Sequence, residues 1–156
     1  MKLAKGLLIV ALAAGTFAIG AGLASQPASS SARPYRNGTV WNVAYIRVKP
    51  GMDEAYMTYL SGQWKSLQEA MKKEGLVVSY KVLSCEPHSP TDFNVLLMTE
   101  YKDMATMEAN ESKFDEIAQK LVGDDNKQMQ GYKDRSEIRE VIGNRLSREI
   151  VLEPKK

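Results

Sequence analysis

Residues 41–71 read WNVAYIRVKPGMDEAYMTYLSGQWKSLQEAM, and they predict a strand, a sharp corner and a long helix in succession. The first eight residues are rich in β-branched and aromatic side chains, and the strand ends where Pro50 and Gly51 interrupt it. After this corner, apolar residues recur every three or four positions and so share one helical face. A helix with a single apolar stripe must pack on another element, and we expect it to pack on a sheet that contains its own strand. The stripe consists of Tyr56, Leu60, Trp64, Leu67 and Met71.

The N-terminal residues 1–24 predict a secretory signal peptide. Lys2 and Lys5 give a charged start, and residues 7–19 are largely apolar. Gly22 and Ala24, on either side of Leu23, then place small residues at the two positions that a signal peptidase reads. The alternative is an uncleaved anchor, although the apolar run is shorter than the ~20 residues of a spanning helix. We therefore expect an exported protein, periplasmic or secreted, with no stable membrane insertion after cleavage.

The remaining chain divides into a spacer and one domain. Residues 25–40 are rich in Ser, Pro and Ala and predict a flexible spacer, and residues 41–153 suit a single small domain. Cleavage would remove two of the 21 basic residues and none of the 19 acidic ones, which leaves the mature protein near neutral. A near-neutral chain without a basic stripe argues against nucleic acid as a partner.

The rest of the domain alternates between strand and helix patterns. Residues 76–84 and 93–101 predict an antiparallel pair of strands, and Asp103 is a suitable N-cap for a second helix, which Asn110 and Glu111 interrupt. Residues 124–140 are highly charged and weakly periodic, so a short helix and a loop remain open. Residues 146–152 predict a fourth strand after a turn at Gly143 and Asn144.

This order is typical of an α+β domain of the ferredoxin-like βαββαβ class, with a four-stranded antiparallel sheet and helices on one face. The third strand is apolar on both sides: Phe93, Val95 and Leu97 alternate with Leu96 and Met98. The face without helices therefore needs a cover, and the same face of a second copy is the simplest one. We expect a homodimer.

Several motifs also resemble a known superfamily. RVKPG before a helix that carries an aromatic residue, then VSYKVL, a proline-bearing loop and FNVLLMTEYKDMAT are similar to the dimeric α+β barrel superfamily, and more narrowly to small exported bacterial proteins without assigned activity. The resemblance covers residues 41–121, and the closing strand REIVL agrees with it. It implies the dimeric barrel fold, but that superfamily contains haem-degrading and antibiotic-biosynthesis monooxygenases as well as proteins of unknown role. Fold alone does not choose among them.

The sequence offers little for catalysis. One histidine, His88, and one cysteine, Cys85, cannot supply a zinc or Fe–S site, so we predict no metal, no cofactor and no catalytic residue. His88 and Cys85 share a proline-containing loop, where a solvent-exposed histidine is ordinary. His88 also lies outside the second helix, which argues against a resemblance to the haem-degrading branch of the superfamily.

Polar and aromatic residues within the strands give the candidate site. If they converge inside the barrel, they would line an amphipathic pocket for a small aromatic or anionic ligand. We choose the face of Tyr45 because Ala44, Ile46 and Val48 form the better seat for the helices. The competing interpretation is that the two arginines of the set pair with Glu100 or Glu149, as charges near sheet edges often do. The set is Trp41, Tyr45, Arg47, Tyr80, Asn94, Tyr101 and Arg148.

The leading hypothesis is therefore an exported, non-catalytic domain that binds a small ligand or is structural. One alternative is a small cofactor-independent oxygenase-like enzyme, with Tyr45, Arg47 and Asn94 orienting its substrate in the barrel. Another is an envelope module that binds a second protein, for which a large exposed apolar patch outside the dimer interface would be required.

Overall fold

The computed structural model describes residues 33–153. The expected signal peptide at residues 1–24 lies outside this range, as does the spacer up to residue 32. The elements, in chain order, are β1 (Tyr35–Val48), α1 (Asp53–Tyr59), the π-helical turn η1 (Leu60–Trp64), α2 (Lys65–Lys73), β2 (Ser79–Ser84), β3 (Val95–Tyr101), α3 (Met104–Ala109), α4 (Glu111–Leu121), α5 (Asp125–Ser136) and β4 (Arg139–Leu152).

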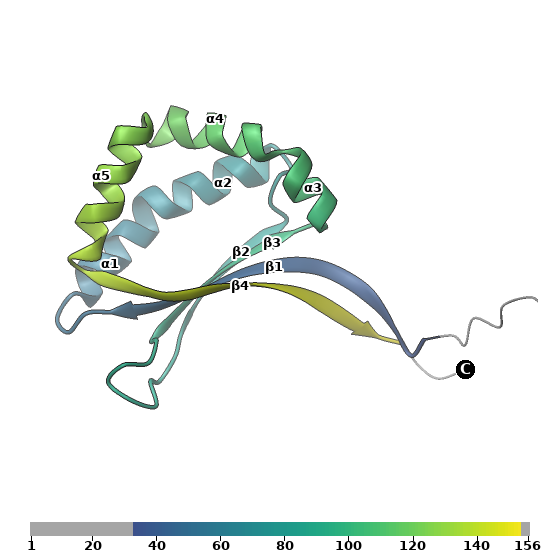
Figure 1. Cartoon of the computed structure of the whole chain (residues 1–156), viewed down its shortest axis with the longest axis horizontal. Coiled ribbons are helices and arrows are strands. Elements are labelled where there is room, and N and C mark those ends of the chain that lie inside the picture. Colours follow the sequence, from purple (N-terminus) through teal and green to yellow (C-terminus); the bar gives the residue numbers. More distant parts are fainter. Residues whose placement is uncertain (1–32, 154–156) are drawn as a thin grey trace, which may run out of the picture. The chain divides into compact units, whose positions relative to one another are not determined.

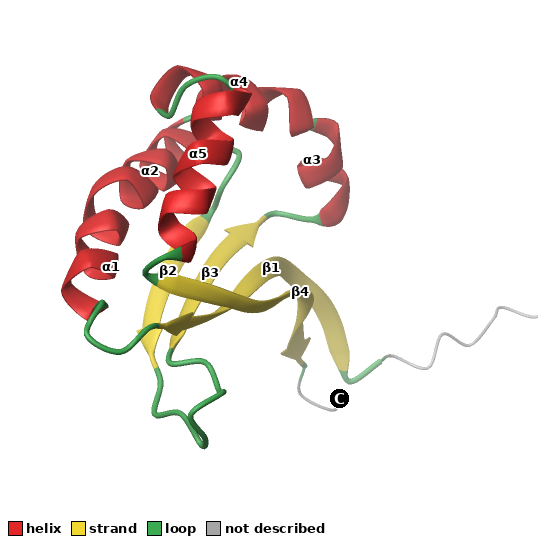
Figure 2. Ribbon diagram, turned by 60° about the vertical axis from the view of Figure 1, so that its left-hand side comes forward, coloured by secondary structure: helices red, strands yellow, loops and turns green. Residues whose placement is uncertain are grey.

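The strands form a four-stranded sheet in the order β2-β3-β1-β4, and every neighbouring pair is antiparallel. Two crossover connections, each made of helices, separate β1 from β2 and β3 from β4. This is the ferredoxin-like arrangement, so the predicted fold class is confirmed. Figures 1 and 2 show all the helices on one side of the sheet.

The helices rest on an apolar strip of the sheet. Ile46 and Val48 are buried in one cluster with Tyr56 and Leu60, and Ala44 packs against that cluster. Because successive side chains of a strand point to opposite faces, the odd-numbered residues between them in β1 point to the other face of the sheet. The prediction that this strip seats the helices is confirmed.

The predicted long helix is present but contains an irregular turn. The N–H of Lys65 bonds the carbonyl of Leu60, five residues back, which is the spacing of a π turn. The apolar stripe passes through this turn, since Leu60 is buried and Trp64 is half-buried. The helix ends before Gly75, whose positive φ of 71° suits glycine.

The second crossover consists of three helices. The Asp103 carboxylate accepts a hydrogen bond from the Thr106 N–H at 2.6 Å, which confirms the predicted N-cap. The helical stretch breaks at Asn110, where α3 ends and α4 begins. Of the two alternatives for residues 124–140, the helix is correct for Asp125–Ser136, because α5 occupies those residues.

β1 and β4, which pair with each other, both begin earlier than the sequence pattern indicates. β1 begins at Tyr35 instead of residue 41, so residues 35–40 of the expected spacer belong to the sheet. β4 begins at Arg139, so the turn expected at Gly143 and Asn144 is wrong, and both residues lie within the strand. The cause is mutual pairing: β1 and β4 form a long ribbon that extends beyond β3.

β2 and β3 begin later than expected. β2 begins at Ser79 and β3 at Val95. Leu76 and Val77, which the pattern placed in a strand, are instead buried beneath the helices in a second apolar cluster with Met71. Burial, not strand pairing, accounts for their apolar character.

Candidate functional site

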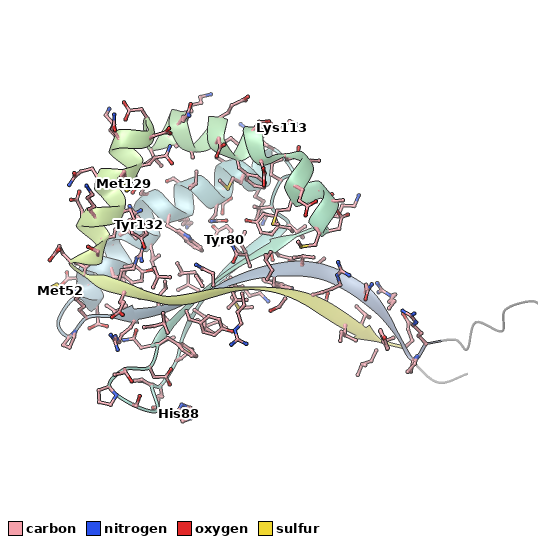
Figure 3. All side chains as sticks on the ribbon, viewed as in Figure 1. Met52, Tyr80, His88, Lys113, Met129 and Tyr132 are labelled. Atoms are coloured by element: carbon pink, nitrogen blue, oxygen red, sulfur yellow. The ribbon has the colours of Figure 1, made fainter. Side chains whose placement is uncertain are left out.

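A cleft of about 560 Å³ lies on the helical side of the sheet. One wall comes from α1, η1 and α2, and the other comes from α4 and α5. In Figure 3, Met129 and Tyr132 extend from α5 on the same side of the sheet as Tyr80. The lining residues are Tyr59, Gln63, Trp64, Leu67, Ala118, Val122, Asp125, Gln128, Met129, Tyr132 and Arg135.

The cleft walls are mainly apolar and aromatic. The π turn contributes Gln63 and Trp64 to the first wall, and π turns are common at functional sites. On the second wall, Met129 is 57% exposed and Tyr132 is 53% exposed, although both are large apolar side chains. A mostly apolar cleft with a few polar groups is the usual form of a small-molecule site.

Arg135 lines the α5–β4 end of the cleft, and Arg139, which is not a lining residue, lies over the ring of the lining residue Tyr132. The guanidinium carbon of Arg135 lies 4.8 Å from the centre of the Tyr59 ring, and that of Arg139 lies 5.6 Å from the centre of the Tyr132 ring. The register pairs Arg139 with Val48, which places it on the helical side. Within residues 33–153, neither arginine belongs to an ion pair.

Three buried polar atoms near the same end of the cleft lack partners among the described residues. They are Tyr56 Oη, Arg135 Nε and Arg139 Nε. Burial raises the pKa of Tyr56 to about 12, although the two nearby arginines oppose this rise. An unpartnered buried polar atom costs free energy, so these atoms call for a functional explanation.

The remaining polar groups of the cleft are few. Asp125 lies in the first turn of α5, at the other end of that helix from Arg135. Gln128 Nε2 donates a hydrogen bond to the Gly123 carbonyl at 2.9 Å, across the start of α5. The cleft is therefore polarised, with an acid at one end and arginines at the other.

The open face of the sheet carries three of the seven predicted site residues, Trp41, Tyr45 and Arg47. Lys81 lies over the Trp41 ring at 5.2 Å, and Arg145 lies over the Tyr45 ring at 6.0 Å. Arg47 forms an ion pair with Glu140. The competing interpretation of the sequence predicts an ion pair of Arg47 with Glu100 or Glu149. The ion pair is present, but its acid is Glu140.

The other four predicted residues do not join them on that face. Tyr80 donates a hydrogen bond to Glu69 of α2, which raises its pKa, and it meets Trp64 edge-on. Tyr101 packs edge-on against Phe114 of α4, and burial raises its pKa. These two tyrosines therefore lie on the helical side.

Asn94 and Arg148 also lie apart from Tyr45. The Asn94 side-chain oxygen accepts a hydrogen bond from the Val48 N–H at 2.8 Å, so it binds the end of β1. Arg148 is exposed and pairs in register with Val40. The structure thus brings together only Trp41, Tyr45 and Arg47 from the predicted set.

Cys85 and His88 lie far from the cleft. The loop between β2 and β3 hangs on the side of the sheet opposite the helices, and Figure 3 shows His88 at its tip. The His88 side chain is 96% exposed, with Nδ1 at 3.5 Å from Asp92 Oδ2. Its geometry is that of an ordinary surface histidine.

Two further results concern metals and membranes. Within residues 33–153, the structure contains no group of three or more His, Cys, Asp or Glu side chains close enough to hold a metal ion. No helix in this same part of the chain has the length and apolarity required to cross a membrane.

The sequence analysis does not predict the cleft: none of the residues that line it belongs to the predicted set. A signal for one wall was present in the charged segment 124–140. Its residues Asp125, Gln128, Met129, Tyr132 and Arg135 recur at steps of three, one, three and three, which is one face of a helix. That face carries too little apolar surface to be recognised as a packed stripe.

Comparisons with known proteins yield likenesses of fold. The chain matches no protein-family model and no curated protein. HapK from Hahella chejuensis is a similar solved structure, with 11% identity, 70% of this chain and 91% of that chain covered, and a TM-score of 0.48. A dimeric ferredoxin-like protein from an uncultured marine organism is 14% identical, with 77% of this chain and 100% of that chain covered and a TM-score of 0.48.

A third similar structure is a nipsnap family protein with unknown function from Agrobacterium tumefaciens. It is 10% identical, with 74% of this chain and 90% of that chain covered and a TM-score of 0.46. The fold class of the present chain rests on its own strand order and antiparallel pairing. These likenesses agree with that class and give no function.

Proposed function

We propose that this protein is an exported, non-catalytic homodimer that binds a small molecule in the cleft between its helices. The observation that carries the proposal is the cleft itself: about 560 Å³, with walls of aromatic and aliphatic side chains. This volume lies within the usual range for sites that hold small organic ligands, roughly 300–1,000 Å³. Met129 and Tyr132 are exposed to water in the cleft, which is unfavourable for apolar surface. A bound apolar molecule would remove this surface from water.

The cleft does not have the composition of a typical acid–base catalyst. Among the described lining residues the ionisable side chains are Asp125, Arg135 and two tyrosines, Tyr59 and Tyr132. Tyr56, whose pKa is raised to about 12, is fully buried and does not line the cleft. This composition supports binding over catalysis.

Export is supported by the sequence of residues 1–24, and dimerisation by the open face of the sheet. On that face, Val43 pairs with Met98, and Tyr45 pairs with Leu96, which pairs in turn with Leu83. Residues 124–145 leave this apolar band uncovered, because α5 lies with the other helices (Figure 2). A second copy is the cover we propose, and Trp41, Tyr45 and Arg47 remain a predicted site in the space between the two sheets.

Native mass spectrometry of protein purified from its own cell envelope tests these proposals together. We expect a dimer whose chains begin near residue 25 and which retains a small molecule. A monomer would contradict the proposed dimer, and an intact signal peptide would contradict cleavage.

A cleft-filling variant tests where the molecule binds. Ala118 lines the cleft from α4, so Ala118→Phe should reduce the retained molecule strongly. Ala105→Phe is the matched control, because Ala105 is exposed on α3 and does not line the cleft. Equal retention in the two variants would contradict ligand binding at this place.

A further inference from the structure

We propose that the ligand of the cleft carries a carboxylate, which the guanidinium group of Arg135 binds at the α5–β4 end, where Arg139 adds a second positive charge nearby. This inference rests on the proposed ligand-binding function and adds the chemical class of the ligand. It depends on three observations: two arginines without acidic partners, their unpartnered Nε atoms, and the apolar walls beside them.

The arginines are cations that the described protein leaves uncompensated. Each lies over a tyrosine ring, Arg135 over Tyr59 and Arg139 over Tyr132, where cation–π attraction holds the guanidinium plane. Ring stacking leaves the edges of a guanidinium free to donate hydrogen bonds. A carboxylate accepts two parallel hydrogen bonds from such an edge, which makes it a well-matched partner.

The helix dipole explains only part of this arrangement. Arg135 lies in the last turn of α5, where a cation is favourable. Arg139, however, lies in β4, outside the helix. The dipole also gives no reason for burying the Nε atoms of both arginines without an acceptor among the described residues.

Two of the acidic groups of α5 and its N-cap accept hydrogen bonds from other residues. Asp134 accepts a hydrogen bond from Gln130 Nε2 at 2.7 Å, and Asp124 accepts one from the Lys127 N–H at 2.9 Å. Asp125 lines the cleft, but ten residues of helix separate it from Arg135, or about 15 Å along the axis. A ligand carboxylate is therefore favoured at the arginine end and disfavoured at the Asp125 end.

The walls next to the arginines define the rest of the ligand. Trp64, Leu67 and Met129 offer apolar surface between the two ends of the cleft. A small inorganic anion would leave this surface in contact with water. An aromatic or aliphatic body that carries the carboxylate would bury it, and so gain the hydrophobic contribution as well.

A matched pair of probes tests the inference: 2-naphthylacetate, which carries a carboxylate, and 2-naphthylacetamide, which has the same body without charge. Binding is followed by the fluorescence of Trp64 in a Trp41→Phe background, which removes the second tryptophan. We expect the carboxylate to bind about 10- to 100-fold more tightly than the amide, as a charged hydrogen-bonded pair gives. Added salt should reduce this difference.

Two variants assign the effect to Arg135. Arg135→Gln should lower the affinity for naphthylacetate to that for the amide and leave amide binding unchanged. Lys133→Gln is the matched control: it removes one charge from the same turn of α5, at an exposed residue that does not line the cleft. Arg135→Lys, which keeps the charge, should retain part of the preference.

The outcomes separate the two proposals. Equal affinity for both probes, or an equal loss in Arg135→Gln and Lys133→Gln, would overturn the carboxylate class and leave the cleft as a binding site. If neither probe changes the Trp64 signal and the Ala118→Phe variant retains the native molecule, the cleft is not the binding site and the proposed function of the cleft fails. Melting curves of each variant verify that the fold is intact.

Discussion

Gly131 is a glycine in the middle of α5, where it weakens the helix. A Cβ at this position would lie 3.0 Å from Arg135 Nη1, so the guanidinium rests against the helix because residue 131 has no side chain. Glycine inside a helix costs about 0.5–1 kcal/mol relative to alanine. The chain therefore accepts a less stable helix in the place where Arg135 reaches the cleft.

Gly131→Ala should raise the free energy of unfolding by about 0.5–1 kcal/mol and weaken naphthylacetate binding. The reason is that the new methyl group stabilises α5 but displaces the guanidinium. Urea denaturation and probe titration measure the two effects. A variant that is more stable and binds the probe as tightly as before would show that Gly131 has no role in positioning Arg135.

Tyr56 combines complete burial with an unpartnered hydroxyl. Its side chain is 0% exposed within the apolar cluster beneath α1, and its Oη has no hydrogen-bond partner among the described residues. Removal of an unsatisfied buried hydroxyl is neutral or stabilising. Tyr56→Phe should therefore raise the free energy of unfolding at pH 7 by up to about 1 kcal/mol.

The pH dependence of this variant follows from the pKa of Tyr56, which is about 12 in the folded state and near 10 unfolded. Below pH 10 the hydroxyl is protonated in both states, so its contribution is complete. As pH rises from 10 toward 12, the unfolded state loses its proton first, and stability falls. Tyr56→Phe should lose less stability over this interval, as urea midpoints at each pH would show; parallel losses would contradict the assignment.

Among the elements, α5 is the one that supplies most of the polar side of the cleft. Its first turn is fixed by Asp124, whose carboxylate accepts a hydrogen bond from the Lys127 N–H at 2.9 Å. Asp124→Ala should lower the free energy of unfolding by about 1 kcal/mol, the usual value of an N-cap. Asp115→Ala, at an exposed acid in α4, is the control, and equal urea midpoints for the two variants would contradict the role of the cap.

Periodicity predicts some of these elements and not others. The apolar stripe from Tyr56 to Met71 is strong enough to predict a helix. It does not reveal the π turn at Leu60–Trp64, because apolar residues on both sides of the turn still recur every three or four positions. The pattern of residues 124–140 does not decide between helix and loop, because the exposed faces of α5 are charged and its inner face lines a cleft instead of a core. The early starts of β1 and β4 depend on pairing between distant segments, which local pattern does not report.

The candidate site was predictable only within one strand. Alternation correctly separates Tyr45 and Arg47 from Ala44 and Ile46. The face of Tyr80 depends on the register of β2 against β3, which pairs Tyr80 with Thr99 on the helical side. Register is set by the whole hairpin, and so residues from different strands cannot be gathered into one site by alternation alone.

The molecule as a whole has one covered and one uncovered sheet face. Neighbouring residues of the edge strand β2 offer a matched test of the proposed dimer. Leu83 pairs with Leu96 and so shares the open face, and it is 43% exposed; Val82 pairs with Leu97 and is 39% exposed on the helical side. A charge at either position is thus accessible to water in a single chain.

Leu83→Glu should convert the dimer to a monomer, because it places one carboxylate from each copy in the proposed apolar interface. Val82→Glu should remain dimeric. Light scattering after size-exclusion chromatography measures the mass of both variants. A dimeric Leu83→Glu protein, or an equal loss in both variants, would show that the open face is not the contact surface.

The bulge at Ile142 has a consequence for the cleft. In the register of β1 and β4, Gly143 pairs with Tyr45 and Val141 pairs with Ile46, so Ile142 is an extra residue without a partner. Past this bulge, the side chains of β4 alternate between the two faces in the opposite order. Were Ile142 drawn into a regular ladder, Arg139 would exchange sides with Glu140, and an acid would stand where the proposed anion binds. The charge that β4 contributes near that end is thus set by a backbone irregularity, which a count of charges along the strand would never reveal.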